Sequence, residues 1–146
     1  MTFVLLIAAA TAVLVAGELL HVRYRRLAWQ RRRETFRTFA SSYRDGEIHA
    51  DVLAATQSYF DQITGVRDFP VRPEDSLLGV YGLAREDVQD AVAIIASTLD
   101  CPPVAVQGSR TTDGERTVQD LVHTTHRLHL AVRTPNAART RAGSRA

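Results

Sequence analysis

The 146-residue chain contains no lysine and only one cysteine, and each absence narrows the possible classes of protein. A single cysteine, Cys101, excludes an intramolecular disulfide framework and a cysteine-rich zinc site. All 18 basic residues are arginines, a bias that we attribute to genomic composition. Charged residues make up 23% of the chain, which excludes a polytopic membrane protein, and the 45% hydrophobic content excludes a wholly disordered one. The length allows one small domain with appendages.

The chain also lacks the motifs of the common enzyme classes. It has no Gly-x-Ser-x-Gly elbow, no P-loop, no dinucleotide fingerprint and no His-Glu-x-x-His. No pair of carboxylates stands out as an acid–base site. Cys101 precedes two prolines near a predicted helix end, away from the helix N-termini that activate thiols, and is interpreted as structural. We therefore expect no enzyme, no cofactor and no metal, and an enzyme remains an alternative only with a site that these motifs do not reveal.

The net charge of +2 conceals three blocks of opposite sign. Residues 18–46 carry a net +5, residues 47–120 a net −8, and residues 121–146 a net +5. An acidic central domain between two basic segments therefore suggests two different partners, an anionic membrane and a basic protein face.

The N-terminal segment is apolar and predicts a membrane anchor. Residues 3–17 carry no charge, and Glu18 is the only charged residue between them and Arg23. A bilayer core about 30 Å thick needs about 20 helical residues. We expect a transmembrane helix over residues 1–22, single-pass in the inner or plasma membrane, with the N-terminus outside and the C-terminal domain in the cytoplasm. A cleaved signal peptide, which would need a basic start, and a buried helix are the alternatives.

A basic stretch follows at residues 23–46 and contains no proline or glycine before residue 44. A continuing helix that binds anionic lipid is the favoured interpretation, and nucleic-acid binding is the alternative. The residues expected at the membrane flank are Arg23, Arg25, Arg26, Trp29, Arg31, Arg32 and Arg33.

Three amphipathic helices are predicted in the acidic domain, residues 47–132, which makes the fold class all-α. The first has apolar positions from Ile48 to Ile63, and the second runs from about Arg85 to Leu99. Thr117 is expected to cap the third, with Asp120 completing a capping box. The expected core faces of the three helices are Ile48, Val52, Leu53, Ala55, Tyr59, Phe60 and Ile63; Val88, Ala91, Val92, Ile94, Ile95 and Leu99; and Val118, Leu121, Val122, Thr125 and Leu128.

The order of these segments resembles an acyl carrier protein. The matching segments are Val71-Arg72-Pro73-Glu74-Asp75-Ser76-Leu77, Tyr81-Gly82-Leu83 and Thr117-Val118-Gln119-Asp120-Leu121-Val122. The resemblance covers about residues 47–130 and implies a three-to-four-helix carrier-like bundle. A different small helical bundle remains the alternative.

The residue that would carry the activity of that family is missing. In carrier proteins a serine at the start of the second helix receives phosphopantetheine, and here Arg85 occupies that position. Arginine has no hydroxyl and forms no phosphodiester. The resemblance therefore implies a degenerate, non-catalytic interaction domain. Ser76 lies in the preceding loop and Ser97 late in the second helix, so neither occupies the required position. A working acyl or peptidyl carrier modified at an unexpected serine stays open.

Carrier proteins meet their partners through an acidic second helix, and this chain has acids at comparable positions: Glu86, Asp87 and Asp90. Clustered acids steer a basic partner, although a merely solvated helix face is equally compatible with them. The sequence thus predicts a membrane-anchored, non-catalytic interaction or accessory subunit, either alone with a basic protein partner or within a larger membrane complex.

Two further features lie near the C-terminus. His123, His126 and His129 are three residues apart, but one helix does not aim all three at a single ion, and we expect polar-face histidines instead of a metal site. Residues 133–146 are arginine-rich with few apolar residues, which predicts a disordered tail.

Overall fold

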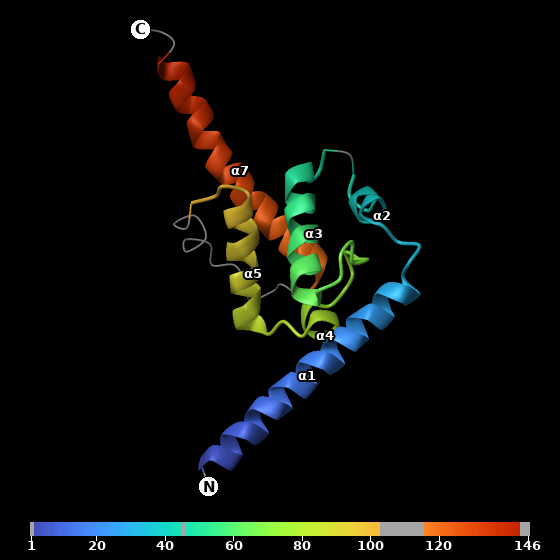
Figure 1. Ribbon diagram of the computed structural model, residues 1–146. Coiled ribbons are helices and arrows are strands. Elements are labelled where there is room, and N and C mark those ends of the chain that lie inside the picture. Colours follow the sequence, from blue (N-terminus) through green and yellow to red (C-terminus); the bar gives the residue numbers. More distant parts are fainter. Residues whose placement is uncertain (1, 45, 103–115, 144–146) are drawn as a thin grey trace.

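The computed structural model describes residues 2–44, 46–102 and 116–143, and it describes side chains for residues 11, 15, 17–44, 46–102 and 116–133. These residues form helices and no strand, so the all-α class is confirmed for them. The helices are α1 (Thr2–Gln30), α2 (Phe36–Ser41), α3 (Ala50–Thr64), α4 (Leu77–Tyr81), α5 (Arg85–Thr98) and α7 (Val118–Gly143) (Figure 1).

Helices α3, α5 and α7 contact one another and enclose the centre of the core (Figure 1). The 3.6-residue spacing of their apolar residues places one face of each helix against the other two. Side chains that are almost fully buried come from all three helices: Val52 and Phe60 on α3, Val92 and Ile95 on α5, and Val118, Leu121 and Val122 on α7.

The ends of these helices follow local chemistry. Gly65 adopts the left-handed conformation (φ 65°) that ends α3, which residues with a Cβ rarely adopt. At the start of α7, the Thr117 backbone N–H donates to the Asp120 carboxylate at 3.0 Å, and the Asp120 N–H donates to the Thr117 hydroxyl at 3.3 Å. The predicted capping box is therefore confirmed.

Helix α1 differs from the predicted membrane anchor. Within the residues whose side chains are described, no helix is long and apolar enough to cross a membrane. This finding overturns the transmembrane helix over residues 1–22, the single-pass topology and the membrane location; the described side chains of that segment are those of residues 11, 15 and 17–22. The described part of α1 includes exposed Glu18, and from Tyr24 onward the helix packs against the domain.

The basic stretch after residue 22 contributes side chains to the folded core. Helix α1 ends at Gln30, the chain turns over residues 31–35, and α2 follows, so residues 23–46 do not form one continuous helix. Tyr24, Phe39 and Tyr43 are buried, and the Tyr24 hydroxyl donates to the carbonyl oxygen of Tyr81 at 2.9 Å. These aromatic rings join α1 and α2 to the bundle.

The C-terminal segment also differs from its prediction. Helix α7 continues to Gly143, where the sequence predicted a disordered tail from residue 133 (Figure 1). Residues 144–146 of that tail and the segment 103–115 lie outside the described residues.

Two neighbouring isoleucines on α5 provide a test of the core. Ile95 is fully buried, whereas Ile94, which the sequence placed on the core face, is 46% exposed. Because Ile95→Asp buries an unpaired charge, we expect loss of helical circular dichroism and of a cooperative thermal transition. Ile94→Asp is the matched control and should keep both. Retention of the native spectrum by the Ile95→Asp protein would contradict this description of the core.

Candidate functional site

The start of α5 is the position at which a carrier protein would hold its serine. Ala84 is the N-cap residue and Arg85 is the first residue of the helix, so the structure places Arg85 where the sequence did. The sequence placed Ser76 and Ser97 away from this position. The Ser76 hydroxyl accepts from the Gly79 N–H at 3.0 Å and caps α4, and the Ser97 hydroxyl donates to the Ile94 carbonyl at 2.7 Å. Neither serine lies at the N-terminus of α5.

The three predicted partner-binding acids are all exposed in the first turns of α5, but their surroundings differ. The Asp87 carboxylate accepts from the Ala84 N–H at 2.8 Å and completes the N-terminal cap of the helix. The negative charge of a carboxylate in this position also interacts favourably with the positive end of the helix dipole. Asp87 therefore stabilises the helix.

Glu86 and Asp90 form a different surface. They are four residues apart, so they share one face of α5, and Ile94 lies one further turn along it. All three are exposed, and neither carboxylate has an ion-pair partner within the described part of the chain. We call Glu86, Asp90 and Ile94 the α5 stripe. Two uncompensated negative charges beside an exposed aliphatic side chain make it a candidate contact surface.

The arginines expected at a membrane flank have several surroundings. Arg23 donates to the Gly79 carbonyl at 2.6 Å, and the Arg32 guanidinium lies over the ring of exposed Trp29, 5.3 Å from its centroid. The other exposed arginines of this set are Arg25, Arg26 and Arg33. Arg31 is the exception, because its side chain is only 12% exposed.

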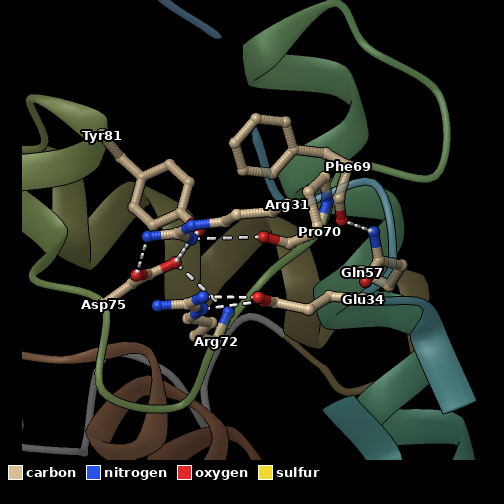
Figure 2. Close-up of polar contacts among 8 residues, drawn as sticks. All are labelled: Arg31, Glu34, Gln57, Phe69, Pro70, Arg72, Asp75 and Tyr81. Atoms are coloured by element: carbon tan, nitrogen blue, oxygen red, sulfur yellow. Dashed lines mark hydrogen bonds and ion pairs between the residues drawn. The ribbon is translucent and has the colours of Figure 1, made fainter. Parts of the chain in front are cut away.

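Arg31 pairs with a buried carboxylate. Figure 2 shows its guanidinium facing Asp75, whose side chain is 4% exposed, with Nη1–Oδ2 and Nη2–Oδ1 distances of 2.7 and 2.8 Å. Oδ2 of Asp75 also accepts from the Tyr81 hydroxyl at 2.9 Å and from the Arg72 N–H at 3.2 Å. Burial and the neighbouring Asp75 charge raise the pKa of Tyr81 far above its usual range, so this hydroxyl stays protonated and donates.

A second ion pair lies beside the first. The Arg72 guanidinium makes two bonds to the Glu34 carboxylate, one of them from Nε to Oε2 at 2.7 Å (Figure 2). These bonds hold the pKa of Glu34 below its usual range. Gln57 donates to the Phe69 carbonyl at 2.7 Å and holds the same loop to α3.

This network has a structural role. Asp75 accepts four hydrogen bonds, three at Oδ2 and one at Oδ1, and two of them come from the Arg31 guanidinium, so the buried carboxylate is held firmly within the fold. Arg31 joins the end of α1 to the loop before α4, and Glu34 joins the turn after α1 to the same loop. The sequence did not indicate this network, because its partners are 38 and 44 residues apart.

The histidine series on α7 does not converge on one point. The His123 ring lies against Tyr43, with ring centroids 6.1 Å apart, whereas His129 is buried. His126 Nδ1 accepts from the backbone N–H of His49 at 3.2 Å. The pKa values of His126 and His129 are lowered, mainly by burial, so their neutral forms are favoured.

The structure instead brings His129 to the start of α3. His129 lies beside His49, with ring centroids 5.3 Å apart, and Asp51 Oδ2 is 3.2 Å from His49 Nδ1. The sequence separates His49 from His129 by two predicted loops and a helix, so spacing alone did not pair them. The only local sign is the His-x-Asp order at residues 49–51.

The buried pair of Arg31 and Asp75 provides a stability test. Arg31→Met keeps the length of the side chain but leaves the Asp75 carboxylate buried without its counter-charge, and we expect the free energy of unfolding to fall by about 3–5 kcal/mol. Arg33→Met, two residues along and exposed, is the control and should change it by less than about 0.5 kcal/mol. Urea denaturation measures both, and equal effects would contradict the role of the pair.

The Glu34–Arg72 pair predicts a pH dependence. The pKa of Glu34 is lower in the folded chain than its usual value of 4.5, so the stabilisation is present above that value and is lost as the pH falls through the folded pKa. We expect Glu34→Gln to be less stable than wild type by up to about 1 kcal/mol at pH 7, with the difference shrinking below about pH 4.5.

Urea denaturation at several pH values measures this difference, and exposed Glu18→Gln is the control. A difference between Glu34→Gln and wild type that stays constant down to pH 3 would refute the assignment.

Comparison with known proteins adds no relative: no family model, no curated protein and no solved structure matches the chain. The resemblance to acyl carrier proteins thus stays a prediction.

Proposed function

We propose that this chain is a non-catalytic interaction module that binds a partner protein through the α5 stripe. The observation that carries the proposal is the exposure of Glu86, Asp90 and Ile94 on one face of a helix whose opposite face is buried in the core. The helix is held at its start by the Asp87 cap, so the stripe is presented on a fixed element.

The partner is defined by the chemistry of the stripe. Two carboxylates about one helical turn apart, roughly 5.4 Å along the axis, fit arginine or lysine side chains with a similar spacing. Their charge speeds the encounter with a basic surface, and the exposed Ile94 side chain offers apolar area for a contact that excludes water. A basic protein face with an apolar position beside its charges is therefore the expected partner.

The reactive groups of the described residues support a non-catalytic role. The Asp75 carboxylate is buried and paired with Arg31, and the hydroxyls of Ser76 and Ser97 take part in local bonds at helix ends. Cys101 is buried, and burial raises the pKa of its thiol, which disfavours the nucleophilic thiolate. Arg85 supplies no hydroxyl at the carrier position.

The proposal predicts that charge reversal on the stripe weakens binding. A partner captured with the full chain would be identified, purified and titrated by isothermal calorimetry with wild type and with Glu86→Arg/Asp90→Arg. We expect the double variant to bind at least about tenfold more weakly, because it sets like charges against each other. Ile94→Asp, for which we expect the fold to be kept, should weaken binding as well.

The matched control reverses two other exposed acids, in Glu47→Arg/Glu74→Arg. Burial raises the pKa of both Tyr43 and Tyr59, and nearby acids add to the rise: Glu47 and Glu74 at Tyr43, and Asp90 of the stripe at Tyr59. The control acids therefore lie near a different tyrosine from the one that Asp90 lies near. The control should bind like wild type. A partner that binds all four proteins equally would refute the stripe as its contact surface.

A further inference from the structure

His49, Asp51 and His129 converge at a point away from the α5 stripe. His49 is the N-cap residue of α3, Asp51 lies in the first turn of that helix, and His129 comes from the middle of α7. One ligand atom of each residue lies within 4.8 Å of the corresponding atoms of the other two. Two imidazoles and a carboxylate are ligands that divalent transition metals prefer.

The buried member of the cluster lacks a hydrogen bond. The His129 side chain is 4% exposed, and its Nε2 atom is buried with no hydrogen-bond partner in the described part of the structure. Buried polar atoms in folded proteins are nearly always bonded, so an unpaired one calls for an explanation. A metal ion coordinated by this ring supplies one.

We propose that His49, Asp51 and His129 bind one divalent transition-metal ion, with Zn²⁺ as the best chemical match. Zinc takes histidine nitrogen and aspartate oxygen at about 2.0–2.2 Å, so the three ligands must draw closer together than they are here. Asp51 and His49, whose side chains are 60% and 40% exposed, would move, while buried His129 fixes the position of the ion. To bind the ion, His49 gives up a present contact, either the Asp51 N–H that Nδ1 accepts at 3.3 Å or the Arg133 guanidinium at Nε2.

His126 helps to position one of the proposed ligands, His49. Its Nδ1 accepts the backbone N–H of His49 at 3.2 Å and so holds the residue before α3 against α7. His126 is therefore a positioning residue and not a ligand. The bound ion would join the start of α3 to α7 and stabilise the folded chain, because it binds the native arrangement of ligands.

Arg133 gives the proposal a distinctive consequence. Its Nη1 atom lies 3.2 Å from His49 Nε2 and its Nη2 atom 4.0 Å from Asp51 Oδ2, so a positive charge already lies beside two of the ligands. A metal ion must displace or tolerate this guanidinium. Removal of the charge should strengthen metal binding, whereas a purely structural cluster predicts no such gain.

The experiment titrates the tag-free full chain with ZnCl₂ by isothermal calorimetry, in parallel with thermal unfolding. We expect wild type to bind one Zn²⁺ and to unfold at a higher temperature with it. Asp51→Asn and His129→Gln should weaken binding by about a hundredfold or more, and Arg133→Met should strengthen it about tenfold. His123→Gln, on the same helix but outside the cluster, is the control and should match wild type.

Three outcomes would overturn the proposal. They are absence of Zn²⁺ binding by wild type, binding that Asp51→Asn leaves unchanged, and binding that Arg133→Met does not strengthen. Asp51 and Arg133 are both exposed, so these two variants decide the question even if His129→Gln fails to fold. None of these measurements depends on the proposed partner, and loss of the metal site would leave the α5 stripe untouched.

Discussion

The burial of the Asp75 carboxylate is the constraint on which much of this structure depends. A charge taken out of water must be compensated where it lies, and Arg31 supplies the compensation from the turn after α1. The backbone of Asp75 also holds the start of α7, because its carbonyl oxygen accepts from the Val118 N–H at 3.0 Å. One residue thus fixes the end of the first helix and the beginning of the last against the same loop.

This arrangement separates the polar groups of the molecule into two kinds. Asp75, Glu34 and their arginines are bonded to one another and hold the fold together (Figure 2). Glu86 and Asp90 face solvent on a helix that the core already fixes, and the cluster around His129 contains a buried nitrogen without a bond. Both proposals rest on the unused bonding capacity in these two places.

The parts of the fold that follow from local pattern were predictable, and the parts that depend on distant partners were not. The spacing of apolar residues placed α3, α5 and the start of α7, and the Thr117–Asp120 cap was visible in the sequence. Ile94 was assigned to the core because two adjacent isoleucines leave the exact face undetermined. Arg31 was taken for a membrane-flank residue, since nothing near it in the sequence reveals a carboxylate 44 residues away. Of the proposed metal ligands, only His129 lay in a series that drew attention.

The Arg31–Asp75 pair also decides where the folding unit begins. A boundary drawn from composition falls near residue 47, where the basic stretch gives way to the acidic domain. A shortened chain starting there would contain Asp75 without Arg31, Arg72 without Glu34, and Tyr81 without Tyr24. Its three main helices would be present in full, yet the loop that connects them would carry two orphaned charges. The autonomous unit therefore extends back into α1, and the charge blocks of the sequence do not mark its edges.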